Sequence, residues 1–506
     1  MKKILIILFA VALVSCTDLE ITPNSQLTDQ SSFKSKTEFL NGLAGVYTTL
    51  SYWSEVVYKP GSSTDEMVFP ARGGDWKGDL QPMYLHTWTS TNGEIAGVYS
   101  GLSKMIAVSN TFIDMIDASS YKDDNEVKVM KGEARFIRAF GYFLMCDYFG
   151  NVPLVTTSAY DPKNLPKQAK RADIYNFVKT ELIDLSNNVL PATNSYGRVD
   201  KFAAETLLAK LYLNSQVYLG TPSNTNLADI VTLTADIMTN SSFSLDDDFK
   251  HVFAWNNDVN NKENIFTMVC DSRNTAASNI SYLFTITDLS EKYGSFASGW
   301  DGCATLPDFY RSFEATDIRR NMWIAGPQFA ADGVTPIMAT DDQGVRRQLD
   351  YVVDFKSTDP VNNADHWDGV RGGKYLMDGI GGTMVTTSLN NDMPILRYAD
   401  VLMMRAEALY RQNPASAEAL TLVNRVRKRG GNPVPAFTSL TDENFLAERG
   451  REFAWEGWRR NDQIRFGTYN KATNYKTASA EYHNLFPIPA TQIQSNPNLV
   501  QNQGYN

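Results

Sequence analysis

Apolar side chains between residues 126 and 149 recur every three or four positions, which is the spacing of one face of an α-helix. Gly150 and Pro153 follow directly, and both residue types end helices. The pattern therefore predicts one long helix over residues 126–149. The apolar positions on its face are Val127, Met130, Ala134, Ile137, Phe140, Phe143 and Leu144.

Two further helices are predicted after this one. Asp173 is a favourable N-cap and precedes apolar positions that continue at helical spacing as far as Pro191. Asp200 opens the next helix, whose pattern fades before Gly220. Together these helices form the first half of a predicted scaffold, over about residues 126–240.

The later half of the chain repeats the pattern more clearly. Residues 395–410 are predicted to form one helix that Asn413 and Pro414 break, and residues 417–429 its antiparallel return. The pair spans roughly 34 residues, the length of a tetratricopeptide helix pair. Full tetratricopeptide signatures are absent, so stacked helical hairpins and a generic helical bundle both stay open at this point. This second half of the scaffold covers about residues 395–467.

Charged and aromatic residues alternate in a predicted helix over residues 448–462. Charges three or four positions apart, such as Glu448 with Arg451, can pair on a helix surface. The default interpretation is a solvated charged face. Phe453, Trp455 and Trp458 lie between the charges and indicate that some pairs hold the helix against neighbouring loops.

Two long segments, over about residues 50–100 and 246–392, are rich in Gly, Asn, Asp and Thr and show no persistent helical pattern. Long irregular segments in a compact protein are usually functional loops on a rigid scaffold. The predicted fold class is therefore mostly α: a tetratricopeptide-like helical hairpin scaffold with a large irregular, loop-rich face. The ligand site is expected in these two segments.

The N-terminus has the pattern of a bacterial lipoprotein signal. Lys2 and Lys3 precede an apolar stretch of about half the ~20 residues that a membrane-spanning helix needs, and a small residue precedes Cys16. We expect residues 1–15 to be removed and the Cys16 thiol to carry lipid, with a tether over residues 16–37 and a single domain over residues 38–506. The alternatives are a buried N-terminal helix or a chance cysteine in an ordinary signal peptide.

Composition narrows the function classes. The 506 residues are 43% hydrophobic and 12% aromatic, enough for a packed core, and the formal net charge is −10. Because no basic stretch is long enough to follow a phosphate backbone, nucleic acid is not an expected partner. Beyond Cys16 an odd number of cysteines remains, without C-x-x-C spacing, which argues against a disulfide framework or a zinc ribbon.

Known catalytic motifs are absent. The sequence has no G-x-S-x-G elbow, H-E-x-x-H pair, phosphate-binding loop or EF-hand loop, and its four histidines are isolated. We therefore expect no catalytic residues, no metal site and no cofactor. A glycosidase needs only two carboxylates at a set separation, so motifs alone do not exclude that class.

Carbohydrate binding has requirements that the two irregular segments meet. Sugar rings present apolar C–H faces and hydroxyl edges, so a site needs aromatic platforms with Asp, Asn and Arg side chains nearby. For any one tryptophan, a place in the core is an equally good interpretation. The first segment offers Asp65, Arg72, Trp76, Trp88 and Asn92, and the second offers Trp300, Asp301, Arg371 and Lys374.

A series of motifs in a fixed order resembles the SusD/RagB family of surface glycan-binding lipoproteins of Bacteroidota. The series begins with the lipid-attachment signal and covers nearly the whole chain. Its later members are Gly132-Glu133-Ala134-Arg135-Phe136, Asp147-Tyr148-Phe149-Gly150-Asn151, Gly197-Arg198-Val199, Leu396-Arg397-Tyr398-Ala399-Asp400, the charged segment at 448–462, Leu485-Phe486-Pro487-Ile488-Pro489 and Asn496-Pro497-Asn498-Leu499.

The resemblance implies a non-catalytic protein that is lipid-anchored in the cell outer membrane and faces the exterior. It implies a scaffold of four tetratricopeptide-like hairpins and a SusC-like TonB-dependent transporter as partner, to which the protein delivers an oligosaccharide or polysaccharide. The site positions that it implies are Asp65, Arg72, Trp88 and Asn92 in the first segment, and Trp300, Cys303, Arg371 and Tyr398 in the second; the last group resembles positions in members that bind fructans.

Other functions stay open at this stage. An envelope glycoside hydrolase on a helical fold would shorten a polysaccharide, whereas a binding protein leaves its length unchanged. A pure scaffold for protein partners, or a peptide-binding member of the same family, predicts no carbohydrate binding at all. The sequence also leaves open which glycan is bound and whether the loops hold calcium.

Overall fold

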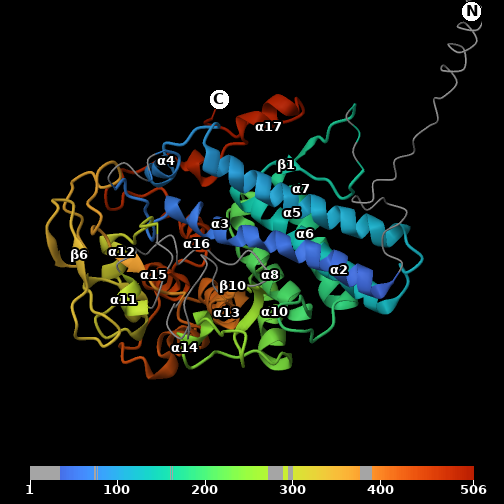
Figure 1. The fold of residues 1–506 in the computed structure, drawn as a ribbon. Coiled ribbons are helices and arrows are strands. Elements are labelled where there is room, and N and C mark those ends of the chain that lie inside the picture. The colour runs from blue at the N-terminus through green and yellow to red at the C-terminus, as the bar shows by residue number, and fades with distance from the viewer. Residues whose placement is uncertain are drawn as a thin grey trace, which may run out of the picture.

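Helices make up most of the structure, as the sequence predicted (Figure 1). The computed structural model describes residues 35–72, 76, 78–159, 161, 163–271, 289–293, 300–375 and 390–505. The predicted signal, the lipidation site Cys16 and most of the tether lie outside the described residues. The helices are α2 (Lys36–Tyr47), α3 (Tyr52–Tyr58), α4 (Leu80–Leu85), α5 (Gly93–Ala118), α6 (Asn125–Tyr148), α7 (Arg171–Asp184), α8 (Lys201–Leu213), α9 (Ser215–Leu219), α10 (Leu227–Asn240), α11 (Ser290–Tyr293), α12 (Pro307–Arg311), α13 (Tyr398–Gln412), α14 (Ala417–Arg427), α15 (Asp442–Phe453), α16 (Arg459–Arg465) and α17 (Ala490–Ser495).

The strands are short and pair two by two, always antiparallel. The β1–β2 pair lies within the first half of the helical scaffold, and the β3–β10 pair joins the second irregular segment to the second half; the pairs β4–β9, β5–β8 and β6–β7 all belong to the second irregular segment. The strands are β1 (Val152–Pro153), β2 (Gln168–Ala169), β3 (Asn264–Met268), β4 (Trp323–Ile324), β5 (Gly326–Pro327), β6 (Met338–Thr340), β7 (Arg346–Gln348), β8 (Asp350–Tyr351), β9 (Arg371–Gly372) and β10 (Met393–Arg397).

Helix α6 is the long helix that the periodicity predicted. The Asp124 side chain caps it by accepting hydrogen bonds from the backbone N–H groups of Glu126 (2.9 Å) and Val127 (3.3 Å). From Phe136 to its end every side chain of α6 is buried. Gly150, with φ of 71°, reverses the chain just beyond the helix. The helix is therefore a central element of the core.

The next two predictions differ in accuracy. The helix predicted to start at Asp173 begins earlier, because α7 starts at Arg171; Asp173 lies in its first turn and accepts from the backbone N–H of Lys170 (3.3 Å). The helix predicted at Asp200 is confirmed, since Asp200 caps α8 by accepting from the N–H of Ala203 (2.9 Å).

Residues 395–397 form a strand, where the apolar pattern predicted a helix. They belong to β10, and α13 begins only at Tyr398. Every residue of β10 and of its partner β3 is buried, so a continuous apolar run of this length fits a buried strand as well as a helix. The following hairpin is confirmed: α13 packs against α14, which ends at Arg427.

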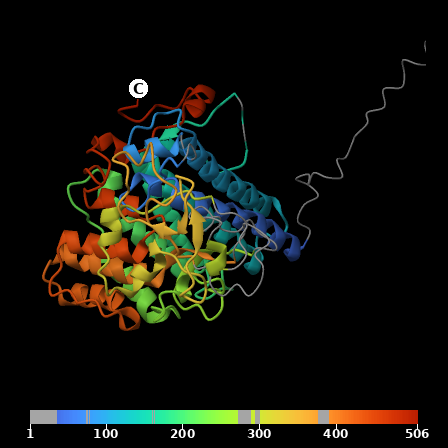
Figure 2. The ribbon, with the colours of Figure 1, turned by 60° about the vertical axis from the view of Figure 1, so that its left-hand side comes forward.

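The helices and the loop-rich segment occupy different parts of the molecule. Figure 1 shows α2, α5, α6 and α7 side by side at one end, while α11, α12 and β6 lie at the other. In Figure 2 the strand-bearing segment comes forward in front of the helices. Helix α5 begins at Gly93, so the first irregular segment is shorter than predicted, and it contains α3 and α4 as well.

The loop-rich segment has a small core of its own. A cluster of buried apolar side chains, separate from the main core, lies beneath β4, β6 and β8. This cluster explains how a segment without long helices keeps a fixed shape. Its members are Leu289, Ile324, Ile337, Ala339, Leu349, Tyr351 and Trp367.

Charged residues near the C-terminus are buried, where the default interpretation placed them in solvent. A break at Ala454–Trp458 divides the predicted helix into α15 and α16, and Trp455 and Gly457 both have positive φ. Glu448 does pair with Arg451 (2.8 Å), but it is fully buried. Glu448 also pairs with Arg319 (2.7 Å) and with Arg427 of α14 (2.8 Å), so the indication that some pairs hold the helix against neighbouring elements is confirmed.

Candidate functional site

The two irregular segments meet in the structure although more than 200 residues of the chain separate their contacting residues. Val68 and Ala304 exchange backbone hydrogen bonds of 2.9 Å in both directions. Thr305 donates its backbone N–H to the carbonyl of Val370 at 2.9 Å. These bridges bring the region around Arg72, the region around Trp300 and strand β9 to one place.

A buried arginine pair fixes this junction. Arg72 donates to the backbone carbonyls of Asp301 (2.8 Å), Gly302 (2.5 Å) and Asp368 (2.8 Å). Arg371 donates to the Asp301 carboxylate at 2.7 Å and to the carbonyl of Asp368 at 2.7 Å. Both guanidinium groups are almost completely buried, so they act on the protein's own loops.

The charges of this pair are balanced by a single shared acid. Burial, together with the neighbouring charge of Arg371, lowers the pKa of Arg72 to about 10. Arg72 therefore stays charged at neutral pH. The Asp301 carboxylate lies 2.7 Å from Arg371 and 3.8 Å from Arg72, and its backbone has a positive φ of 48°. Holding this strained residue in place fixes Trp300 beside it.

Above the arginine pair, two tryptophans form an aromatic surface, which we call the Trp76–Trp300 surface. The two ring centroids are 6.2 Å apart with an angle of 45° between the planes. The indole N–H of Trp76 donates to the carbonyl of Trp300 (3.1 Å), and the Trp76 ring packs against Phe69. Trp300 is 52% exposed.

Two of the predicted site residues, Trp88 and Asp65, have other contacts within the protein. The Trp88 ring is 4% exposed, packs against Phe486 and donates its N–H to the Tyr505 hydroxyl (2.7 Å). Asp65 forms a two-point ion pair with Arg459 at 2.7 Å. In these positions both side chains stabilise the fold, and neither presents a free face to a glycan.

Three more predicted residues have structural positions. Asn92 caps α5 by accepting from the N–H groups of Glu94 (3.1 Å) and Ile95 (3.0 Å). Cys303 is completely buried. Tyr398 is the buried first residue of α13. The structure thus brings Arg72, Trp76, Trp300 and Arg371 together and separates them from the other predicted positions.

Sequence reasoning missed the residues that support the aromatic surface. Phe69 packs against the Trp76 ring, and the Arg371 guanidinium lies 4.7 Å from the centre of the Tyr351 ring. The backbone carbonyl of Asp368 accepts hydrogen bonds from both Arg72 and Arg371. Lys374, which the loop composition had suggested as a ligand group, is buried and donates to the carbonyl of Ala454 (2.8 Å). No local pattern identifies such partners, because their contacts join distant parts of the chain.

Glu66 is a buried acid that links the junction to the C-terminal region. Its carboxylate accepts from the backbone N–H of Trp455 (3.2 Å), and its carbonyl accepts from the Thr305 hydroxyl (2.8 Å). Burial, only partly offset by the charge of Arg459, raises the pKa of Glu66 from 4.5 to about 8. The folded protein therefore holds this group protonated at neutral pH.

This shift predicts a pH-dependent effect of Glu66→Gln. Between pH 4.5 and 8 the unfolded chain ionises Glu66 while the folded protein keeps it protonated, so this group lowers stability increasingly as the pH rises. Glutamine removes that cost. At pH 8 we expect the free energy of unfolding of the variant, measured by urea denaturation, to exceed that of the wild type by at least about 1 kcal/mol. At pH 4 the two proteins should be equally stable. Equal stability at both pH values would contradict the shift.

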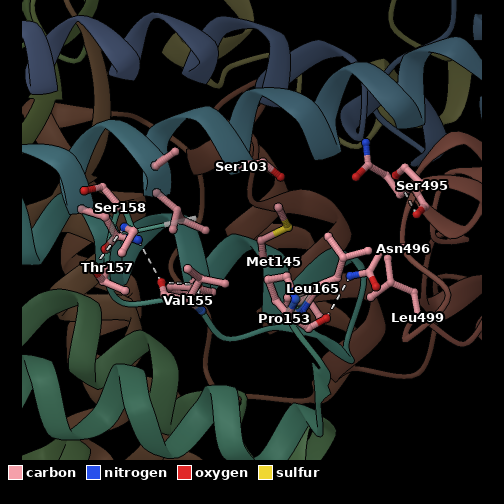
Figure 3. Close-up of a pocket in the computed structure, with 18 of the residues that line it drawn as sticks. Ser103, Met145, Pro153, Val155, Thr157, Ser158, Leu165, Ser495, Asn496 and Leu499 are labelled. Atoms are coloured by element: carbon pink, nitrogen blue, oxygen red, sulfur yellow. Dashed lines mark hydrogen bonds between the residues drawn. The ribbon is translucent and has the colours of Figure 1, made fainter. Parts of the chain in front are cut away.

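A pocket lies elsewhere, on the helical scaffold. It has a volume of about 550 Å³ and lies between α5, α6, the chain after β1 and the C-terminal region around α17 (Figure 3). Asn496 closes one side by donating to the carbonyl of Pro166 (2.9 Å). Its aromatic lining residues Tyr99 and Tyr142 are almost fully buried, so it offers no stacking platform like that of Trp300.

Neither a metal centre nor a membrane span occurs in the described parts of the chain. No group of three or more His, Cys, Asp and Glu side chains there is arranged to hold a metal ion. No helix among the same residues combines the length and the apolar character that crossing a bilayer requires.

Comparison with known proteins identifies the family. The family model described as "SusD family" matches residues 262–505, and the one described as "Starch-binding associating with outer membrane" matches residues 19–213. The chain is 27% identical to the starch-binding protein SusD of Bacteroides thetaiotaomicron, over 92% of this chain and 86% of that protein.

Solved structures show the same fold. A SusD superfamily protein from Parabacteroides distasonis aligns with a TM-score of 0.75 and 19% identity, over 95% of this chain and 100% of that one. Surface glycan-binding protein A from Bacteroides fluxus aligns with a TM-score of 0.73 and 21% identity, over 93% and 100%. The predicted SusD-like fold is confirmed. With family models matching both its N-terminal and its C-terminal parts, the chain belongs to the SusD family.

Proposed function

We propose that this protein captures an oligosaccharide or polysaccharide at the cell surface and delivers it, uncleaved, to a SusC-like TonB-dependent transporter of the outer membrane. Proteins of the SusD family bind glycans without catalysing a reaction on them. The relative in Bacteroides thetaiotaomicron is named for starch binding, and one matching family model is described as associating with the outer membrane. These relationships support a glycan ligand at a membrane surface.

The observation that carries the proposal is the Trp76–Trp300 surface. Large aromatic rings are mostly buried in soluble proteins, so a half-exposed tryptophan beside a second indole is a feature that binding explains. Their flat faces suit the C–H face of a sugar ring. Arg72 and Arg371 keep the two loops in register beneath, which reduces the ordering cost of binding.

Attachment to the membrane completes the proposal. Lipid on Cys16 would hold the protein at the outer face of the outer membrane, with the tether leading to α2, which begins at Lys36. Buried acyl chains contribute about 0.8 kcal/mol per CH₂, so two or three chains are a durable anchor. Anchoring also raises the effective concentration of the binding surface near a transporter, so weak affinity for each sugar is sufficient.

The test of this function is retention in native gels that contain soluble starch, laminarin or inulin. We expect at least one of these polysaccharides to retard the wild type, and Trp300→Ala to weaken that binding about 30-fold. Such a loss corresponds to about 2 kcal/mol, the usual effect of truncating an aromatic residue at the centre of a binding site.

A matched control is Trp255→Ala, which removes a tryptophan that is 38% exposed and lies outside the Trp76–Trp300 surface. It should migrate like the wild type. Equal retention of the wild type and Trp300→Ala in every gel that retards the protein would exclude the surface as the binding site. A fall in polysaccharide chain length during incubation would favour the hydrolase alternative.

A further inference from the structure

A histidine and an aspartate connect two loops of the second irregular segment. The backbone N–H of His366 donates to the Asp342 carboxylate at 2.9 Å, and the imidazole Nδ1 of His366 forms a hydrogen bond with the other carboxylate oxygen. Asp342 lies between β6 and β7, and His366 lies in the turn before β9. We call these two residues the His366–Asp342 pair.

Arg371 places this pair next to the loop that carries Trp300. One guanidinium nitrogen of Arg371, Nη2, donates both to the Asp301 carboxylate (2.7 Å) and to the backbone carbonyl of His366 (2.7 Å). Two acceptors that share one nitrogen atom are close neighbours. The backbone of His366 therefore lies beside the side chain of Asp301, the residue that directly follows Trp300.

The pair leaves one imidazole nitrogen for a ligand. The His366 side chain is 45% exposed, and in the described part of the chain no hydrogen bond uses its Nε2. Burial alone would raise the pKa of Asp342, but hydrogen bonds from His366 lower it, so the carboxylate is ionised at neutral pH and can only accept. Nδ1 of His366 therefore carries the proton, and the neutral ring presents Nε2 as an acceptor.

A sugar needs a partner for its hydroxyl edge as well as for its ring face. The indole rings of the Trp76–Trp300 surface serve the face. The arginine pair beneath them cannot serve the edge, because Arg72 and Arg371 are almost completely buried and donate to protein groups. The His366 side chain, in contrast, reaches solvent beside the same loop.

Stability gives only a weak reason for this arrangement. Contacts between exposed charged side chains usually contribute little to stability, and the His366 and Asp342 side chains are 45% and 28% exposed. A histidine that is already held in one orientation needs no further ordering when a ligand arrives, which favours binding.

We propose that Nε2 of His366 accepts a hydrogen bond from a hydroxyl group of the sugar that stacks on the Trp76–Trp300 surface, and that Asp342 is the positioning residue that holds the imidazole. This inference rests on the proposed function, because it names a polar contact for the same ligand. The surface then recognises both an apolar ring face and the position of a hydroxyl group.

Native gels with the polysaccharide that retards the wild type test this contact. His366→Ala is expected to weaken binding about five- to tenfold, the usual effect of losing one hydrogen bond. The matched control is His251→Ala. Nδ1 of His251 also bonds a carboxylate, that of Asp246 (2.7 Å), but its turn, His251–Phe253, packs against β10 of the scaffold. This control should be retained like the wild type.

Imidazole nitrogen shifts, measured by NMR, give a direct readout in the wild type. On addition of an oligosaccharide from the retained polysaccharide, we expect the Nε2 signal of His366 to move. The Nε2 signal of His251, which contacts the Val259 carbonyl at 3.0 Å, should stay unchanged. In Asp342→Asn, His366 should show both neutral tautomers in its nitrogen shifts, and the protein should bind the polysaccharide more weakly than the wild type.

Three results would each overturn the assignment: equal retention of His366→Ala and the wild type, an equal loss in His251→Ala, or a His366 signal that the oligosaccharide leaves in place. A single unaltered tautomer in Asp342→Asn would remove the positioning role. If Trp300→Ala weakens binding and His366→Ala does not, only this inference fails. If no polysaccharide retards the wild type, the proposed function fails and this inference fails with it.

Discussion

Replacing Glu452 with glutamine is expected to lower the free energy of unfolding by about 3–5 kcal/mol. Its carboxylate contacts the guanidinium groups of Arg397 (2.7 Å), Arg319 (3.1 Å) and Arg429, and all of these side chains are buried. Burial alone would raise the pKa of Glu452, but the three arginine charges lower it far below its usual range. Removing the acid takes one buried negative charge away from three buried guanidinium groups, which keep only their other carboxylate partners. Removing one partner from a buried ionic network is strongly destabilising.

The measurement is urea unfolding followed by circular dichroism at pH 7. Glu418→Gln is the matched control, because Glu418 is 51% exposed and pairs with Arg405 at the surface; its loss should cost less than about 1 kcal/mol. If Glu452→Gln loses no more than this control, the network does not carry the charges that we assign to it.

Arg371→Met is expected to abolish polysaccharide retention and to lower the free energy of unfolding by about 3 kcal/mol. Arg371 contacts the Asp301 carboxylate and the carbonyls of His366 (2.7 Å) and Asp368 (2.7 Å), and so ties the turn before β9 to the loop that carries Trp300. Methionine fills the space but leaves Asp301 with only a distant charge contact to Arg72 at 3.8 Å. The loop that presents Trp300 then loses its fixed position.

Native gels with the polysaccharide that retards the wild type measure the binding effect, and urea unfolding measures the stability effect. Arg347→Met is the control: Arg347 lies in the same segment, on β7, and its side chain, which pairs with Asp341, is 49% exposed. This variant should be retained like the wild type, and its free energy of unfolding should change by less than about 1 kcal/mol. Full retention by a folded Arg371→Met protein would show that the arginine pair does not position the surface.

The helical scaffold could be predicted because its signals are local. Apolar residues three and four apart define α6 to within a residue or two, and the capping residue Asp200 marks the start of α8. The same signals placed α7 slightly late, because Asp173 is a capping residue by type but lies in the first turn of the helix. Element boundaries depend on hydrogen bonds that composition does not distinguish.

The features that the sequence could not predict depend on contacts between residues that are far apart in the chain. The β10 strand forms because Met393 and its neighbours pair with β3, far earlier in the chain. The charges of residues 448–462 are buried because arginines from other elements, such as Arg397 and Arg319, surround them. Neither the pairing of β10 with β3 nor the burial of these charges can be recognised from the local pattern of apolar and polar residues.

The candidate site shows the same limit. Trp88 and Trp300 look alike in sequence, since both lie in polar, irregular segments. Trp88 is covered by Phe486 and Tyr505 from the C-terminal region, whereas Trp300 projects from a loop above the arginine pair. Residue type alone predicted both tryptophans as ligand positions, whereas the structure buries Trp88 and leaves Trp300 half-exposed.

The central claim is that the Trp76–Trp300 surface binds the glycan, and a crystal structure of the mature protein with an oligosaccharide of the retained polysaccharide tests it most directly. We predict a sugar ring with carbon atoms within about 4 Å of both indole rings. An oligosaccharide bound in the large pocket of Figure 3 or elsewhere, with no contact to Trp300, would contradict the account.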